Sequence, residues 1–253
     1  MAQSKVLGVI PARYASERLP GKPLADICGK PMIQWTYESC AASESLDGLV
    51  VATDDKRVYD CVIEFGGKSI LTSPRHTSGT ARVCEVADKM QDFEYYINIQ
   101  GDQPFISKDT ISEICYATKG LQEDISVMTL ICKIKEDDED DISIPKVVID
   151  KNSRAIYFSR FPIPFVRSSN NYNISTFYKH LGVYGFTKGA INAIKDLQPS
   201  YLEVAEKLEQ LTWIYEGIPI YTSNGSDLNS LSVDTEYDLR EAIEIAKEKI
   251  KHR

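Results

Sequence analysis

The sequence is poor in the residues that build redox and transition-metal centres. It has 3 histidines and 6 cysteines in 253 residues, and no two cysteines form a C-x-x-C pair. Most of the cysteines lie inside apolar segments, which is typical of reduced thiols in a protein core and not of disulfides or zinc ligands. The few scattered histidines likewise argue against a histidine-built metal centre.

Long apolar runs and an excess of positive charge are also missing. No segment approaches the roughly eighteen apolar residues that a membrane span needs, and the N-terminal apolar stretch is too short for a signal peptide, so we expect a cytoplasmic protein. With 29 basic and 37 acidic residues the net charge is −8, which opposes binding to nucleic acid or anionic lipid. A phosphate ligand would therefore need a local basic cluster.

The order of apolar segments predicts an α/β fold. Short β-branched runs alternate with amphipathic stretches in the first half, a pattern typical of a mainly parallel sheet with helices on both faces. From about residue 125 to 190 the pattern predicts a smaller antiparallel extension. We expect strands at Val6–Ile10, Leu49–Thr53, Ser69–Thr72 and Tyr95–Ile99, and helices at Met32–Ser43, Lys56–Phe65, Thr80–Met90 and Lys108–Thr118.

Two further helices are expected toward the C-terminus. A capping-box sequence at Ser200 predicts a helix that runs to about Leu211. Thr235 precedes a closing helix with one apolar stripe. The length of 253 residues suits one α/β domain that carries the β-rich segment within it.

A basic loop directly follows the first predicted strand. It carries Arg13, Arg18 and Lys22 between glycine and proline residues, at the edge of a parallel sheet where anions bind. A fixed cation about 4 Å from a phosphate is worth on the order of 4 kcal/mol at an effective dielectric constant near 20. Neither the Walker A pattern nor the dinucleotide fingerprint is present. The loop therefore predicts a triphosphate site of a type different from these two motifs. The simpler interpretation is a basic surface loop that improves solubility.

Two aspartates are candidate metal ligands. Asp102 follows a predicted strand and a glycine that permits a tight bend, and Asp234 precedes the last predicted helix. Mg²⁺ takes one or two carboxylates together with phosphate oxygens. Each aspartate alone also has a simpler interpretation, because Asp102 can close a turn and either Asp234 or Thr235 can cap the helix.

Eight segments, taken in order along the chain, resemble the 3-deoxy-manno-octulosonate (Kdo) cytidylyltransferases, or CMP-Kdo synthetases. The resemblance implies a nucleotide-diphospho-sugar transferase fold and a homodimer whose contacts come from the β-rich middle segment. It also implies that CTP and Kdo become CMP-Kdo and pyrophosphate, for lipopolysaccharide or capsule synthesis in bacteria. The segments are IPARYASERLPGKPL, VATDD, SGTARV, NIQGDQP, YFSR, YKHLGVYGF, EKLEQL and VDTEYDL.

The resemblance implies roles for individual residues as well. The catalytic group would be Arg13, Lys22, Asp102 and Asp234, with the two aspartates holding Mg²⁺. Cytosine would be held by Pro11, Ala12 and Arg82, the ribose by Gln100, and the triphosphate by Arg13, Arg18 and Lys22. The acid sugar would be bound by Gln103, Arg160, His180, Tyr184, Glu209 and Gln210.

Three segments depart from the family pattern. Gln103 replaces a glutamate, Ala81 replaces an acidic residue, and Leu228–Ser232 stands where a glycine-rich stretch is common. A glutamine at the first of these positions also resembles the branch that acts on 8-amino-3,8-dideoxy-manno-octulosonate, so an aminated Kdo is an alternative substrate. The residues also leave open a nonulosonate sugar as the substrate, and a regulator that binds nucleotide without catalysis.

Overall fold

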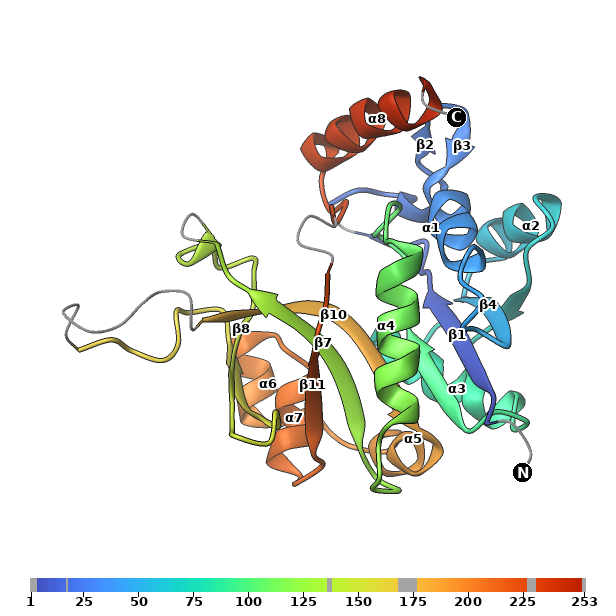
Figure 1. The fold of residues 1–253 in the computed structure, drawn as a ribbon. Coiled ribbons are helices and arrows are strands. Elements are labelled where there is room, and N and C mark those ends of the chain that lie inside the picture. The colour runs from blue at the N-terminus through green and yellow to red at the C-terminus, as the bar shows by residue number, and fades with distance from the viewer. Residues whose placement is uncertain (1–3, 17, 136–137, 168–176, 227–230, 252–253) are drawn as a thin grey trace.

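A 9-stranded mixed sheet forms the centre of the molecule (Figure 1). The structure, a computed structural model, describes residues 4–16, 18–135, 138–167, 177–226 and 231–251. Four neighbouring strands are parallel, and the inner ones are largely apolar, as burial on both faces requires. In sheet order the four strands are β5 (Ser69–Leu71), β4 (Gly48–Thr53), β1 (Val6–Pro11) and β6 (Tyr95–Asn98).

The predicted antiparallel extension is continuous with this sheet. The strand β10 (Tyr178–Thr187) pairs antiparallel with β6 on one side and with β7 (Val127–Lys133) on the other. Outside β7 lies β11 (Ile220–Asn224), which the sequence did not predict. A hairpin of β8 (Lys146–Ile149) and β9 (Ala155–Ser159) is attached to the sheet by pairing between β8 and β10. In Figure 1 this hairpin lies at the opposite side of the molecule from β4.

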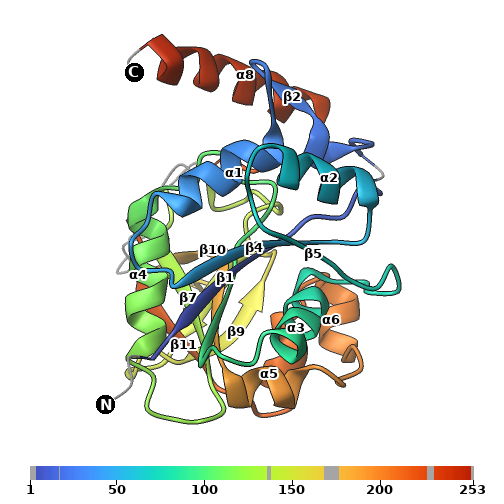
Figure 2. The ribbon, with the colours of Figure 1, turned by 90° about the vertical axis from the view of Figure 1, so that its right-hand side faces the viewer.

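Helices pack on both faces of the sheet, as predicted, and each face has its own apolar core (Figure 2). Several helices begin with a side-chain cap, among them Ser78, Ser107 and Thr187. One face carries α1 (Met32–Ala41), α2 (Lys56–Glu64) and α4 (Lys108–Lys119). The other carries α3 (Gly79–Lys89), α5 (Lys188–Ile194), α6 (Tyr201–Glu206) and α7 (Gln210–Tyr215).

The closing helix α8 (Glu236–Lys251) packs on a third, smaller core. Its Ala242 and Ala246 lie with Met32 and Trp35 of α1 and with the buried Val233. A short hairpin of β2 (Asp26–Ile27) and β3 (Lys30–Pro31) completes this layer, after the single-turn helix η1 (Lys22–Leu24). This packing fixes the chain that immediately precedes α8.

The α/β fold class is confirmed, and the predicted strands and helices of the first half lie within two residues of those observed. One prediction was wrong, since the helix expected from Ser200 to Leu211 is broken in two. Lys207 has a left-handed backbone with a φ of 55°, and its N–H donates to the carbonyl of Glu203, which ends α6. Leu208 is buried at this break. Among the described helices, none is long and apolar enough to cross a membrane.

Candidate active site

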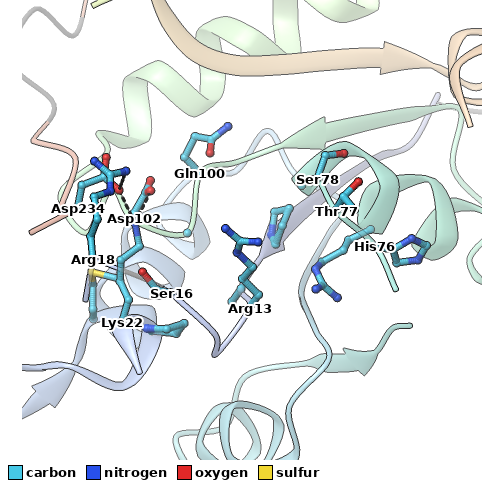
Figure 3. Close-up of a pocket in the computed structure, with 17 residues that line it drawn as sticks. Arg13, Ser16, Arg18, Lys22, His76, Thr77, Ser78, Gln100, Asp102 and Asp234 are labelled. Carbon is cyan, nitrogen blue, oxygen red and sulfur yellow. Dashed lines mark hydrogen bonds and ion pairs between the residues drawn. The ribbon is translucent and has the colours of Figure 1, made fainter. Parts of the chain in front are cut away.

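A cavity of about 500 Å³ opens at the carboxyl ends of β1 and β6. Its wall comes from the loop after β1, the turn after β6, the beginning of α3 and the chain before α8 (Figure 3). The structure thus brings together four distant parts of the sequence. The residues predicted for nucleotide and metal all line it: Pro11, Ala12, Arg13, Arg18, Lys22, Arg82, Gln100, Asp102 and Asp234.

Asp102 and Asp234 converge on a single cation at one end of this cavity. Lys22 Nζ lies 2.8 Å from Asp102 Oδ2 and 2.9 Å from Asp234 Oδ1, and Arg18 Nη2 lies 3.0 Å from the same Asp234 oxygen. Burial alone would lower the pKa of Lys22, but the two carboxylates outweigh burial and raise that pKa above its ordinary value. Lys22 is therefore charged when it holds the two carboxylates.

Backbone contacts bring the two aspartates together. Val233 is fully buried, and its N–H donates to the carbonyl of Asp102 over 2.9 Å. Gly101 allows the turn after β6 to lie against β1, because a Cβ atom there would come within 2.6 Å of the Pro11 carbonyl oxygen. The carboxylate pair is thus set by the core and by the close approach of two strands.

The cap of α8 is Thr235, and this leaves Asp234 for the cavity. The Thr235 hydroxyl accepts from the backbone N–H of Asp238, and Asp238 Oδ2 accepts in return from the N–H groups of Asp234 and Thr235. This is a capping box with aspartate in place of glutamate. Of the two residues that the sequence offered as caps, the structure uses Thr235.

The basic loop has one cation that lies apart from the aspartates. Arg13 lies between the carboxylate end and the His76 end of the cavity (Figure 3), and it forms no ion pair with any described residue. The loop is ordered by Tyr14, whose ring lies 3.5 Å below the Arg57 guanidinium and against Gly21, which has a φ of 69°. Arg13 is thus available to an anion.

The other end of the cavity is formed by α3 and the chain before it. Arg82 is buried, and its guanidinium donates to Asp54 Oδ2, Thr72 Oγ1 and the Ser73 carbonyl. His76 Nε2 lies 2.5 Å from Glu85 Oε2. Because Arg82 is tied on several sides, it forms a fixed positive wall at this end of the cavity.

A second cavity of about 710 Å³ adjoins the first. Thr77, Ser78 and Gln100 line both cavities. The larger cavity contains five of the predicted sugar-binding residues, namely Arg160, His180, Tyr184, Glu209 and Gln210. The sixth, Gln103, does not line either cavity and is 8% exposed in the turn after Asp102.

The polar groups of the second cavity differ in charge. Burial lowers the pKa of His180 to about 3, so its ring is neutral at pH 7. Burial raises the pKa of Glu209, although hydrogen bonds from Thr80 and Ser78 oppose the rise. Gln210 Nε2 is buried and has no partner among the described residues. An unpaired buried donor of this kind suits a ligand acceptor.

Arg160 is one of two cationic residues that line the second cavity, together with Lys207. Its Nε, Nη1 and Nη2 donate to the carbonyls of Glu206, Ile142 and Lys207. These contacts fix the guanidinium at the break between α6 and α7. Since a guanidinium has five N–H donors, hydrogens remain for a ligand carboxylate.

Sequence reasoning missed several lining residues. Among them are Ser16, His76, Thr77 and Ser78 of the first cavity. The last three stand in or beside the segment SGTARV, for which the family resemblance implied a role only for Arg82. The sequence signal for Thr77 and Ser78 was a pair of hydroxyl residues just before a predicted helix, where backbone N–H groups face a ligand.

Comparisons with known proteins identify the family. The cytidylyltransferase family model matches residues 7–222. A 3-deoxy-manno-octulosonate cytidylyltransferase of Parabacteroides distasonis is 41% identical, over 94% of this chain and 97% of the relative. The corresponding protein of Fusobacterium nucleatum is 42% identical, over 96% and 98%. The chain belongs to the 3-deoxy-manno-octulosonate cytidylyltransferase family.

Solved structures agree with this family. A CMP:2-keto-3-deoxy-manno-octonic acid synthetase complexed with CTP matches with a TM-score of 0.90 and 38% identity, covering 97% of this chain and 100% of that one. A 4-diphosphocytidyl-2C-methyl-D-erythritol synthase from Anaerococcus prevotii matches with a TM-score of 0.64 at 12% identity, over 96% of this chain and 99% of that one. The latter likeness concerns the cytidylyltransferase fold alone.

The Glu85 carboxylate beside the first cavity makes stability depend on pH. Burial alone would raise the pKa of Glu85, but Lys89, the Ser73 N–H and His76 lower it to about 2 from an ordinary value of 4.5. Its stabilisation is therefore complete above pH 4.5 and is lost as the pH falls through about 2. We expect Glu85→Gln to lower the free energy of unfolding by about 1.5–3 kcal/mol at pH 7.

Urea unfolding followed by circular dichroism between pH 7 and pH 2 measures this effect. The difference between wild type and Glu85→Gln should shrink as the solution is acidified. Asp88→Asn is the control on the same helix, since Asp88 is more exposed and its ion pair with Lys195 is long at 3.5 Å. A difference that stays constant over this pH range would contradict the assignment.

Proposed function

We propose that this chain transfers CMP from CTP to Kdo and releases pyrophosphate, as a step in the synthesis of a bacterial lipopolysaccharide or capsule. The observation that carries the proposal is the pair of adjoining cavities with different chemistry. One has cations and a carboxylate pair, which suit a nucleotide triphosphate and its metal. The other has Arg160 together with hydrogen-bonding groups such as His180 and Gln210, which suit the carboxylate and hydroxyls of an acid sugar.

The reaction is a direct displacement between ligands in the two cavities. The anomeric hydroxyl of the sugar loses its proton and bonds to the α-phosphorus of CTP, and the bond from that phosphorus to the bridging oxygen of pyrophosphate breaks. Holding the two reactants in line can supply roughly 7–11 kcal/mol of the barrier. The shared wall of Thr77, Ser78 and Gln100 allows bound reactants to meet.

The proposed residue roles are those that the family resemblance implies, and the positions of these residues in the two cavities support them. Arg13, Arg18 and Lys22 neutralise the triphosphate and the departing pyrophosphate. Arg82 forms the cytosine end together with Pro11 and Ala12, and Gln100 faces the ribose. In the second cavity Arg160 takes the sugar carboxylate, while His180, Tyr184, Glu209 and Gln210 take its hydroxyls.

Asp102 and Asp234 fit a Mg²⁺ ion. Both carboxylates already point at one cation, the ammonium of Lys22. No cluster of three or more histidine, cysteine, aspartate or glutamate ligands occurs in the part of the chain that the structure describes. Two carboxylates with phosphate oxygens from the substrate form the ligand set that Mg²⁺ takes. When bound there, the ion neutralises charge on the phosphate oxygens.

The position of Gln103 gives no support for an aminated Kdo. This substitution was the reason to consider 8-amino-3,8-dideoxy-manno-octulosonate, yet Gln103 lies outside the wall of the second cavity. Kdo is therefore the proposed substrate. The cytoplasmic location stays a prediction from the sequence.

A panel of acid sugars tests the function. We expect pyrophosphate release from CTP and Mg²⁺ to require Kdo, to be slower with the 8-amino analogue and a nonulosonate, and to be absent without sugar. An enzyme-coupled phosphate assay measures it. Failure of every acid sugar to support release would indicate a regulator that binds nucleotide without catalysis.

The carboxylate pair should matter for turnover much more than for folding. We expect Asp102→Asn and Asp234→Asn to lower kcat by about 10²-fold or more at saturating Mg²⁺, because charge stabilisation of the phosphates is lost. Their melting temperatures should stay within a few degrees of wild type, since both side chains are partly exposed. Asp60→Asn, on the exposed side of α2, is the control. Wild-type turnover in either active-site variant would refute the role.

We also propose that the chain forms a homodimer through the region around β9. Phe165, Phe161 and Ile142 are 87%, 74% and 65% exposed. Phe161 and Ile142 are brought close by Arg160, which precedes Phe161 and donates to the Ile142 carbonyl. Exposed apolar groups that gather in this way mark an interaction surface.

Light scattering coupled to size exclusion tests the dimer. Wild type should elute with twice the mass of the chain, and Phe165→Ser should shift the population toward monomer at micromolar concentration. Tyr116→Ser is the matched control, because Tyr116 is 84% exposed on α4. A monomeric wild type, or an unchanged mass in Phe165→Ser, would contradict this surface.

A further inference from the structure

A threonine hydroxyl beneath the second cavity connects two strands through a histidine. Thr129 of β7 is fully buried. Its Oγ1 lies 2.7 Å from the Val183 carbonyl oxygen and 2.8 Å from His180 Nε2. His180 lines the cavity, but Thr129 does not. Thr129 can therefore affect a ligand only indirectly, and the cavity-lining side chain that it hydrogen-bonds is His180.

The contact between Thr129 and His180 results from an irregularity in β10. His180 pairs with Ile131 and Tyr184 pairs with Thr129, so the register shifts between these two pairs. Inside the shift Gly182 has a φ of 76°. Two carbonyls in this bulge accept from side chains, with Gln100 donating to Gly182 and Thr129 donating to Val183. The bulge thereby places the His180 ring beside Thr129.

The hydrogen-bond network assigns the histidine tautomer. A carbonyl cannot donate, so a 2.7 Å contact between Oγ1 and the Val183 oxygen is attractive only when the single hydroxyl hydrogen lies between them. Oγ1 must then accept from His180, and the hydrogen of the neutral ring is on Nε2. This leaves Nδ1 with a lone pair.

The remaining surroundings of the ring offer no donor to Nδ1. The rings of Phe158 and Tyr184 lie 5.2 Å and 5.0 Å from the imidazole, measured between centroids. No hydrogen bond to Nδ1 is formed by the described residues. Nδ1 is thus the nitrogen of His180 that forms no hydrogen bond with a described residue, and His180 lines the cavity.

We propose that Thr129 is a positioning residue that fixes His180 as a hydrogen-bond acceptor, so that Nδ1 of the ring accepts a hydrogen bond from a hydroxyl of the sugar. The inference rests on the proposed function, since it concerns the sugar that occupies the second cavity. A sugar carboxylate is excluded from this position, because a carboxylate and a bare ring nitrogen are both acceptors. Thr129 therefore contributes to specificity although it never touches the substrate.

Nitrogen NMR on the ligand-free protein tests the tautomer without turnover. The protein is labelled with ¹⁵N at its 3 histidines, and the signal of His180 is assigned by its loss in His180→Gln. At pH 7.5 we expect Nε2 to be protonated and Nδ1 to be bare. In Thr129→Val the acceptor is gone, and we expect signal from the other tautomer. A wild-type ring protonated at Nδ1 would overturn the proposal.

Kinetics with two matched variants test the consequence for binding. Thr129→Val should raise the KM for Kdo about tenfold, the cost of about one hydrogen bond, and leave the KM for CTP within about twofold. Thr129→Ser keeps the hydroxyl and should retain wild-type values and the wild-type tautomer. Should Thr129→Val fail to fold, the wild-type tautomer and the serine variant still decide the question.

Separate results would overturn the role of Thr129 and the proposed function. An unchanged KM for Kdo in folded Thr129→Val, with normal pyrophosphate release in wild type, would overturn the role of Thr129 and leave the proposed function intact. Absence of pyrophosphate release in wild type with every acid sugar would remove the proposed function, whatever the tautomer of His180.

Discussion

The candidate site depends on the attraction between one ammonium group and two carboxylates. Asp102 and Asp234 carry like charges that repel when close, and Lys22 lies within hydrogen-bonding distance of both. The contact joins the loop after β1, the turn after β6 and the chain before α8. Each is held by a feature of the backbone or of the core: the positive φ of Gly21, the missing side chain of Gly101 and the burial of Val233.

The two cavities use burial in opposite ways. In the first, Arg18 and the two aspartates keep part of their surface exposed, which suits a ligand that arrives with several charges of its own. In the second, burial keeps His180 neutral and raises the pKa of Glu209. The neutral ring of His180 acts by the direction of its hydrogen bonds and not by charge, and this direction distinguishes one sugar hydroxyl from another.

The sequence was most informative where a local pattern decides the structure. The apolar runs of β1, β4 and β6 and the capped helices between them were predictable, and so were Arg13, Lys22 and Asp102 of the first cavity, since they follow strand ends. It could not reveal the break at Lys207, because nothing local marks a lysine for a left-handed backbone. Thr129 was also hidden, since a threonine in an apolar run is ordinary in a strand. Its role depends on the β10 bulge, which arises from pairing between distant strands.

The shared wall of the two cavities has a consequence for how this enzyme can diverge. Thr77, Ser78 and Gln100 line both cavities, so a substitution there that suits a new sugar also alters the nucleotide cavity. Val204 and Lys207 line the larger cavity and not the first, and they form its sugar side. Lineages that adopt a different acid sugar are thus constrained to change that side first, while the nucleotide half of the molecule is inherited intact.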